Sequence, residues 1–304
     1  MERVTSCQVA IIGAGISGMT CALYLARAGV DTALIGDWTT APILASPEIR
    51  NYPGTGKISG YDLLSNLNQQ VQDTNTKIIA GIAAKPTRQS DTWVVLVDTG
   101  DIVEADSLVI ATGASPKLLN LENEQELIGK AVSTCAYCDG PLYAGKKVCV
   151  VGSGTTAIEE ALYLSKIAHT VTVLCRKNKF STSLYTPEQL GNYPNIQLMF
   201  DTQIKSISLD GHGSVIVQLS GNRSRMMLFD GIFYAIGSSP NTEFLGGMLP
   251  VDHSGHIDLA PESERIYRVY ACGDVNARSP FKQAIVAAAD GCETAMRLLC
   301  NLRK

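Results

Sequence analysis

A repeated pattern of strand, glycine-rich turn, helix and strand constrains this chain more than any other feature. Residues 9–36 align without a gap on residues 148–175, and both copies contain a G-x-G-x-x-G/A turn between an apolar run and a helical stretch. One such turn is a weak signal, because glycine-rich turns also arise for purely structural reasons. Two copies in the same context predict two dinucleotide-binding sites.

The glycines of the two turns are expected to have separate roles. In doubly wound α/β folds the first permits a tight turn, the second lets a pyrophosphate approach the backbone, and the third lets the helix pack on the strand. The start of the helix then offers unpaired N–H groups to the phosphates. The turn positions are Gly13, Gly15 and Gly18 in the first copy and Gly152, Gly154 and Ala157 in the second.

The two copies differ in charge where the second strand ends. Asp37 stands at this position in the first copy and Arg176 in the second. An acidic group there suits ribose hydroxyls, whereas a basic group suits an extra 2′-phosphate. The difference predicts FAD or NAD in the first site and NADP in the second; the alternative is that both charges only mark strand ends that reach solvent.

Length and composition fit two ordinary globular domains. The chain has 304 residues, against roughly 100–200 per domain, and its net charge is −4 without long blocks of like charge, which argues against nucleic acid as a partner. Residues 5–26 carry no charge, but their glycines argue against a membrane span or signal peptide. We expect a strand, a turn and a helix from Met19 to Ala28 instead.

The rest of the chain predicts further elements of the same kind. Apolar runs that end in small-residue turns predict buried strands at 108–113, 231–237 and 269–274. Alternating apolar residues between 200 and 230 predict antiparallel strands. A helix is expected over 282–299.

The nine cysteines contain one distinctive pair. An odd number cannot be fully paired within one chain, and seven of them are scattered among apolar neighbours, as buried free thiols are. Cys135 and Cys138 form a C-x-x-C, a spacing that allows a small disulfide and a reactive thiolate. No second pair stands at zinc-ligand spacing, so no metal site is predicted. This usage predicts a cytoplasmic protein.

Few other titratable residues stand in a suggestive context. Asp139 follows the C-x-x-C directly and is the candidate proton donor or acceptor, with a structural Asp-Gly-Pro turn as the alternative. Glu159 and Glu160 are expected to form a solvated or packing face of a helix.

Several motifs in a fixed order point to a known family. They are GAGISG at 13–18, NYPG at 51–54, ATG at 111–113, CAYCDG at 135–140, GSGTTA at 152–157, EEALYL at 159–164, GDV at 273–275 and QA at 283–284. Over nearly its whole length the chain resembles the low-molecular-weight, bacterial-type thioredoxin reductases, which are FAD-dependent pyridine nucleotide-disulfide oxidoreductases.

This resemblance implies an α/β fold with two three-layer, Rossmann-like domains. A discontinuous FAD-binding domain would comprise residues 1–114 and 246–304. An inserted NAD(P)H-binding-like domain at 115–245 would carry the C-x-x-C. The resemblance further implies a homodimer and a nucleotide domain that rotates.

The resemblance also implies roles for single residues. Cys138 would be the sulfur nearest the flavin, Cys135 would attack the protein substrate, and Asp139 would shuttle the proton. The FAD site would contain Gly13, Gly15, Gly18, Asp37, Asn51, Ala111, Thr112, Gly113, Gly273, Asp274, Lys282, Gln283 and Ala284. The NADPH site would contain Gly152, Gly154, Thr155, Ala157, Arg176 and Lys177.

Two stretches depart from the family pattern. The phosphate-binding run reads Cys175-Arg176-Lys177-Asn178-Lys179-Phe180-Ser181, with Cys175 in place of a histidine and Ser181 in place of an arginine. After Asp37, the stretch Thr40-Ala41-Pro42 replaces two glycines that let the backbone contact FAD.

Four functions therefore stay open. The first is an FAD-dependent reductase that passes electrons from NADPH through Cys135 and Cys138 to thioredoxin or a thioredoxin-like protein. The incomplete basic run favours a second, with the same chemistry but with ferredoxin or another non-NADPH donor. The third is a dithiol oxidase that passes electrons to oxygen, and the fourth is a flavin-bearing redox sensor without turnover.

Overall fold

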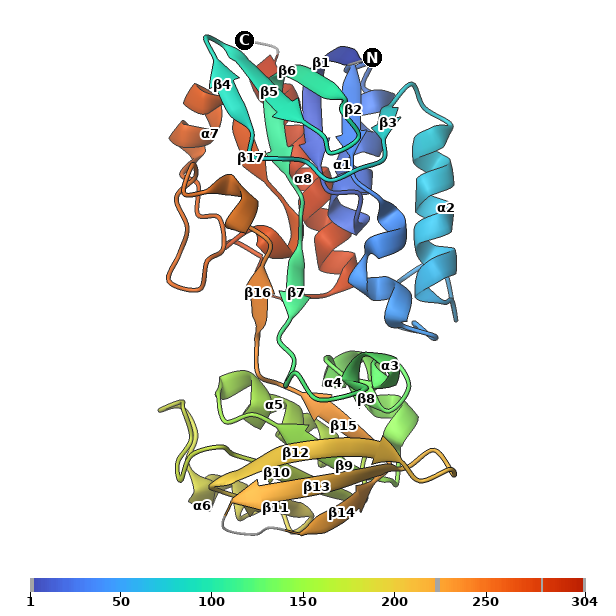
Figure 1. The fold of residues 1–304 in the computed structure, drawn as a ribbon, viewed down its shortest axis with the longest axis vertical. Helices are drawn as coiled ribbons and strands as arrows, with labels where there is room; N and C mark the ends of the chain where they lie inside the picture. The colour runs from blue at the N-terminus through green and yellow to red at the C-terminus, as the bar shows by residue number, and fades with distance from the viewer. Residues whose placement is uncertain (1–2, 222–224, 280, 303–304) are drawn as a thin grey trace. The chain divides into compact units, whose positions relative to one another are not determined.

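The computed structural model describes residues 3–221, 225–279 and 281–302, and the chain divides into two compact units (Figure 1). Unit 1 comprises Met1–Ser115 and Ser239–Lys304, and unit 2 comprises Pro116–Ser238. Residues 239–245 group with unit 1 rather than with the inserted segment expected from the sequence, because Asn241 is hydrogen-bonded to the turn at Thr112 and Gly113.

Unit 1 is built on a seven-stranded sheet in the order β3-β2-β1-β6-β5-β4, with β17 also paired to β6. Its strands are β1 Val4–Ile12, β2 Thr32–Ile35, β3 Lys77–Ile79, β4 Thr87–Gln89, β5 Thr92–Leu96, β6 Ile102–Ile110 and β17 Val269–Ala271. The pairings among β1, β2, β3, β6 and β17 are parallel, whereas β4 and β5 run antiparallel at one edge. The apolar run Val9–Ile12 is buried on both faces of the sheet, as expected for a central parallel strand.

The helices of unit 1 are α1 Ile16–Arg27, α2 Gly60–Gln72, α7 Pro261–Tyr267 and α8 Ala284–Leu302. Short 3-10 turns lie at η1 Trp38–Thr40, η2 Pro42–Ala45, η4 Glu243–Leu245 and η5 Gly273–Val275. Helix α1 begins before the predicted Met19 because Gly15, in an extended conformation, is its N-cap. Helices α1 and α8 approach so closely that a Cβ on Gly291 would lie 2.2 Å from the Ser17 carbonyl oxygen.

Two short strands connect the units. They are β7 Ala114–Pro116 and β16 Ser238–Pro240, and they pair with each other as a two-stranded sheet.

Unit 2 contains a five-stranded parallel sheet in the order β11-β10-β9-β15-β8. Its strands are β8 Val132–Ser133, β9 Lys147–Val151, β10 Thr170–Leu174, β11 Ile196–Met199 and β15 Gly231–Tyr234. Its helices are α3 Glu124–Leu127, α4 Ala136–Asp139, α5 Thr155–Leu164 and α6 Pro187–Leu190, with the 3-10 turn η3 Gly140–Tyr143.

A separate three-stranded sheet follows in unit 2, made of β12 Thr202–Leu209, β13 Val215–Gly221 and β14 Met226–Phe229. Both pairings are antiparallel, which confirms the prediction for residues 200–230. The alternation arises because Val215, Val217 and Leu219 are buried, while the residues between them are less so. Together the two units confirm an α/β fold that contains the same βαβ arrangement twice.

Over the described ranges, no helix is long and apolar enough to cross a membrane. The same residues contain no cluster of three or more His, Cys, Asp or Glu side chains that could hold a metal ion.

Candidate functional site

The first glycine of each repeated turn is required by its close neighbours. Gly13 has φ +117°, and a Cβ there would lie 2.3 Å from the Ala111 carbonyl oxygen. Gly152 has φ +150°, and its Cβ would lie 2.4 Å from the Ala235 carbonyl oxygen. In both units the turn therefore presses against the end of the strand that closes the βαβ arrangement, and only glycine fits.

The second glycine of each turn faces open space instead. Gly15 and Gly154 are the N-caps of α1 and α5, neither supplies a side-chain cap, and a Cβ on either would meet nothing within 4 Å. The first N–H groups of both helices are thus left for another acceptor, and the missing side chain leaves room for it. This cradle fits a pyrophosphate in each unit.

The loop at Gly273 and Asp274 is held in place by a residue that sequence reasoning missed. One carboxylate oxygen of Asp290, on α8, accepts the Gly273 N–H at 2.7 Å and the Asn276 amide at 3.2 Å. Oδ1 of Asp274 is buried, with no hydrogen-bond partner among the residues described. Burial raises the pKa of Asp274. An unpaired buried acceptor at this position fits the hydroxyls of an FAD ribityl chain.

Three further residues predicted for the FAD site gather near this loop and the start of α8. The Asn51 amide donates to Oε1 of Gln283 at 3.2 Å, which joins two distant motifs. The Lys282 ammonium donates to the carbonyl oxygens of Asp274 and Ser279 at 2.9 and 3.2 Å. Partial desolvation lowers the pKa of Lys282, although much of its side chain is exposed, and Ala284 begins α8 directly after this cluster.

The turn at Ala111, Thr112 and Gly113 is fixed by Asn241, a residue that the sequence indicated only as part of an exit loop. The Asn241 amide donates to the Thr112 carbonyl oxygen, and Oγ1 of Thr112 donates to the Asn241 carbonyl oxygen, each at 2.8 Å. The Asn241 N–H donates to the Gly113 carbonyl oxygen at 3.0 Å. These bonds hold the turn against which Gly13 packs.

Asp37 lies at the end of β2, and its carboxylate binds its own loop. It accepts hydrogen bonds from the Thr39 N–H at 2.9 Å and the Thr39 hydroxyl at 2.7 Å, and these lower the pKa of Asp37. The following stretch, where the family has glycines, forms the 3-10 turns η1 and η2. One carboxylate oxygen of Asp37 therefore caps a turn, which leaves the other for a ribose.

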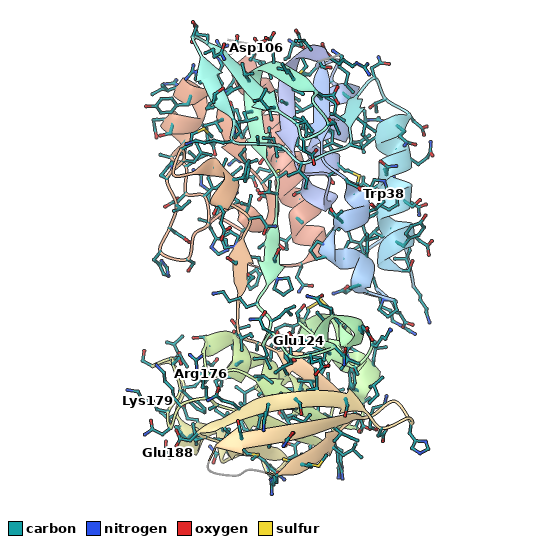
Figure 2. The ribbon with its side chains drawn as sticks, in the orientation of Figure 1. Trp38, Asp106, Glu124, Arg176, Lys179 and Glu188 are labelled. Atoms are coloured by element: carbon teal, nitrogen blue, oxygen red, sulfur yellow. A yellow bond between two sulfur atoms is a disulfide. The ribbon has the colours of Figure 1, made fainter. Side chains whose placement is uncertain are left out.

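The basic run of unit 2 lies at the end of β10. Arg176, Lys177 and Lys179 are exposed, and Figure 2 shows Arg176 and Lys179 on the same side of the unit. Ser181 instead folds back onto the glycine turn, where its N–H donates to the Ser153 carbonyl oxygen at 2.7 Å and the two hydroxyls lie 2.8 Å apart.

Two other members of this site are held by uncharged contacts. The Thr155 hydroxyl, at the start of α5, donates to the Thr182 hydroxyl at 2.8 Å. Cys175 is fully buried, and its thiol donates to the Gly152 carbonyl oxygen at 3.6 Å. Serine, threonine and cysteine thus line the turn, while the cations lie at its edge.

Cys135 and Cys138 are joined by a disulfide, with their Cα atoms 5.3 Å apart. The bond spans the first turn of α4, where Sγ of Cys135 also accepts the Cys138 N–H at 3.2 Å. Cys138 is exposed and Cys135 is half-buried, so an exchange partner can reach the pair within this unit. Four of the other seven cysteines are buried, and all seven are free thiols.

Asp139 is connected to the disulfide through Ser133, which the sequence did not indicate. The Ser133 hydroxyl donates to the Asp139 carboxylate at 2.7 Å and accepts the Cys135 N–H at 3.0 Å. Burial raises the pKa of Asp139, and the Ser133 hydrogen bond opposes that rise. A carboxyl group with a raised pKa beside a disulfide is suited to hold a proton for thiol exchange.

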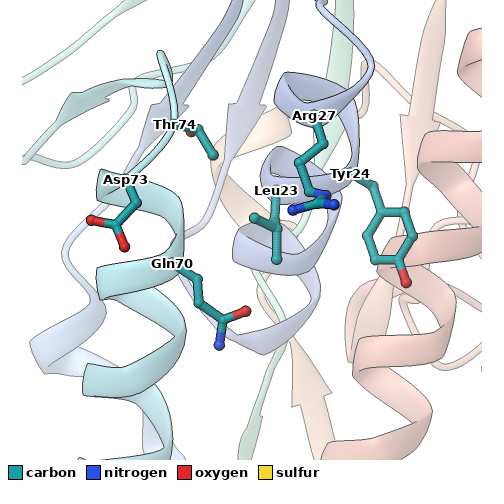
Figure 3. Close-up of a pocket in the computed structure, with 6 residues that line it drawn as sticks. All are labelled: Leu23, Tyr24, Arg27, Gln70, Asp73 and Thr74. Atoms are coloured by element: carbon teal, nitrogen blue, oxygen red, sulfur yellow. The ribbon is translucent and has the colours of Figure 1, made fainter.

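A pocket in unit 1 lies apart from all of these residues. It opens between α1 and α2 and is lined by Leu23, Tyr24, Arg27, Gln70, Asp73 and Thr74 (Figure 3). None of the predicted site residues lines it.

Comparisons with known proteins identify the family of this chain. The pyridine nucleotide-disulphide oxidoreductase family matches residues 7–291. The thioredoxin reductase of Rickettsia typhi is 34% identical, and the alignment covers 98% of each chain. The thioredoxin reductase of Dictyostelium discoideum is 33% identical over 95% of each chain. Among solved structures, the thioredoxin reductase from Giardia duodenalis superposes with a TM-score of 0.89 at 29% identity over 100% of each chain. That from Streptococcus pyogenes superposes with a TM-score of 0.88 at 28% identity over 98% of each.

Proposed function

Because this chain belongs to the pyridine nucleotide-disulphide oxidoreductase family and is an oxidoreductase of the thioredoxin reductase type, we propose that it reduces thioredoxin or a thioredoxin-like protein with electrons from NADPH. The observation that carries the proposal is the Cys135–Cys138 disulfide in the unit that contains the second glycine turn. FAD, when bound in unit 1, supplies two-electron transfer between a nicotinamide and a disulfide.

The residues of unit 1 would hold FAD through complementary contacts. The N–H groups at the start of α1 would bind the pyrophosphate beside Gly15, and Asp37 would bind a ribose hydroxyl through its spare oxygen. Oδ1 of Asp274 would accept a hydroxyl of the ribityl chain. The pair Asn51 and Gln283 would lie beside the flavin ring.

The residues of unit 2 would carry out thiol–disulfide exchange. The Cys135 thiolate would attack the partner's disulfide to form a mixed disulfide, and Cys138 would then attack Cys135 and release the reduced partner. Asp139, held by Ser133, would take and return the proton that these steps require. We further propose that the protein is a cytoplasmic homodimer.

A second candidate keeps this chemistry but takes its electrons from ferredoxin or another donor. It is favoured by Ser181, which stands where the family has an arginine, carries no positive charge and is hydrogen-bonded to Ser153. Arg176, Lys177 and Lys179 still offer positive charge at the edge of the site. These three cations could still bind the 2′-phosphate of NADPH, so the first candidate is retained.

Anaerobic titration of the holoenzyme with NADPH, followed by oxidised thioredoxin, tests the proposal. We expect NADPH to bleach the flavin absorbance and thioredoxin to restore it. Arg176→Ala should raise the NADPH concentration that half-reduces the flavin about ten-fold, the effect of one lost charge-assisted contact. The NADH concentration that half-reduces the flavin should not change, because NADH lacks the 2′-phosphate. Lys205→Ala, an exposed cation on β12, is the matched control. Bleaching by reduced ferredoxin but not by millimolar NADPH would favour the second candidate.

A further inference from the structure

Two adjacent glutamates on α5 have opposite environments. The sequence predicts a common solvated or packing face for Glu159 and Glu160. In the structure Glu159 is exposed, whereas Glu160 is only 4% exposed. A buried carboxyl group requires hydrogen bonds or a neutral state, because its charge is otherwise poorly solvated.

The contacts of Glu160 lead to the redox pair. Its Oε1 accepts the N–H of Ala136 at 3.4 Å, and Ala136 lies between Cys135 and Tyr137 at the start of α4. Its Oε2 is also buried and has no hydrogen-bond partner among the side chains and backbone described. Helix α4 is therefore held by one carboxylate oxygen while the second is left able to carry a proton.

We propose that Glu160 is a positioning residue for the Cys135–Cys138 pair, whose carboxyl group sets the reactivity of the two thiols by exchanging a proton as they ionise. The inference rests on the proposed function, since it concerns the dithiol that this function uses. It assigns a second carboxyl group to the pair, in addition to Asp139.

Charged and titratable groups around Cys135 and Cys138 determine whether the Glu160 charge favours or disfavours ionisation of the two thiols. Glu160 faces the backbone of α4. Burial raises the pKa of the Tyr137 phenol, and the charges of exposed Glu159 and of Glu160 add to that rise. The Tyr137 ring lies 4.7 Å from that of Tyr163, on α5. Burial raises the pKa of Glu160 to about 7, so its charge changes near neutral pH.

The proton balance follows from these groups. Reduction breaks the Sγ–Sγ bond, and the two electrons and two protons yield two thiols. When one of the two sulfurs is a thiolate, the proton that it does not carry can reside on the Glu160 carboxylate. An ionised Glu160 disfavours a thiolate nearby, whereas a protonated one does not. The thiols and the carboxyl group therefore titrate as a coupled set.

Alkylation of the dithiol measures this coupling directly. The holoenzyme is reduced with dithiothreitol and treated with iodoacetamide between pH 5 and 10. Modification is then followed on the tryptic peptide 131–146, which contains Cys135 and Cys138 and no other cysteine. Because dithiothreitol is the reductant, the result depends neither on the electron donor nor on thioredoxin, and failure of the proposed function would be recognised separately.

Glu160→Gln retains an acceptor for the Ala136 N–H and removes the charge. We expect its alkylation profile to move down by about one pH unit, so that modification at pH 7.5 is roughly ten-fold faster. Glu160→Ala should move it in the same direction, and Glu160→Asp should stay near the wild-type profile. Glu159→Gln removes the same charge from the exposed neighbour, where solvent screens it, and should move the profile much less than Glu160→Gln.

Two outcomes would overturn the inference. Superimposable profiles for wild type and both neutral variants would show that the Glu160 charge does not act on the thiols. Equal shifts in Glu160→Gln, Glu160→Asp and Glu159→Gln would show a general effect of substitution on α5.

Discussion

The stability of unit 2 should depend on pH through Glu160. The pKa of this carboxyl group is about 7 in the folded protein, against a usual value of 4.5, because it is buried. Between these values the folded state binds more protons than the unfolded state, so the free energy of unfolding decreases as pH rises. Each unit of pKa corresponds to about 1.4 kcal/mol, which gives a loss of about 3 kcal/mol from pH 4.5 to pH 8.

Glu160→Gln should remove this dependence. The substitution also changes the free energy of unfolding through an unpaired amide or altered packing, but these contributions do not depend on pH. The diagnostic quantity is therefore the change with pH in the difference between variant and wild type. Relative to wild type, the variant should gain about 3 kcal/mol between pH 4.5 and pH 8.

A buried thiol of unit 2 provides the assay. Cys149 lies in β9 and is fully buried, so it reacts with a thiol reagent only when the unit opens. Labelling of Cys149 is measured in increasing urea at several pH values, with the intrinsic reactivity corrected by a short unfolded peptide. The two tryptophans cannot serve here, because Trp38 and Trp93 both belong to unit 1.

Glu159→Gln is the matched control, since it removes the same charge from an exposed position on the same helix. Its stability should follow that of the wild type at every pH. A difference between Glu160→Gln and wild type that is constant from pH 4.5 to pH 8 would refute the reasoning, because it would show that the carboxyl group does not titrate differently in the two states.

Two further predictions concern unit 1. Gly13→Ala should destabilise the unit by about 2–4 kcal/mol and yield protein with little flavin, because the residue has φ +117° and its Cβ would overlap Ala111. Gly15→Ala, in open space, should leave the thermal unfolding of the FAD-free protein, followed by tryptophan fluorescence, as in the wild type. It should weaken FAD binding about ten-fold, the value of one charge-assisted hydrogen bond. Equal melting temperatures for the two FAD-free variants would contradict this assignment. Asp290→Ala should lower the stability of unit 1 by about 3 kcal/mol, since the Gly273 N–H and the Asn276 amide lose a charged acceptor, whereas Asp290→Asn can accept both bonds and should lose less. Flavin retained after gel filtration should follow the same order, and an equal loss in both variants would argue against a hydrogen-bonding role.

The repeated turns could be predicted from the sequence because the backbone conformation that they need is local. The positive φ of Gly13 and Gly152 follows from a short glycine-rich stretch, whereas their close contacts with the carbonyl oxygens of Ala111 and Ala235 come from strands far along the chain. The C-x-x-C disulfide is local in the same sense, since one helical turn brings its two sulfurs together. The start of α1 was predicted too late because the helix begins immediately after Gly15, before its apolar pattern becomes visible.

The residues that the sequence missed act through side-chain contacts that form only in the folded chain. Asp290 reaches back to Gly273, and Asn241 fixes a turn at Thr112. Ser133 lies close in sequence to Asp139, but its role depends on the path of the loop before α4. No spacing rule identifies such partners, because their side chains are ordinary in composition and acquire a role only through packing.

The sequence by itself determined the two glycine-rich turns, the redox pair and the family, since each depends on a short motif whose geometry is set by backbone conformation. Only the tertiary structure decided that one of two adjacent glutamates is buried and contacts the helix of the redox pair. The physical reason is that the helical period gives each residue a direction, while the pKa of a carboxyl group depends on what the rest of the fold places in that direction.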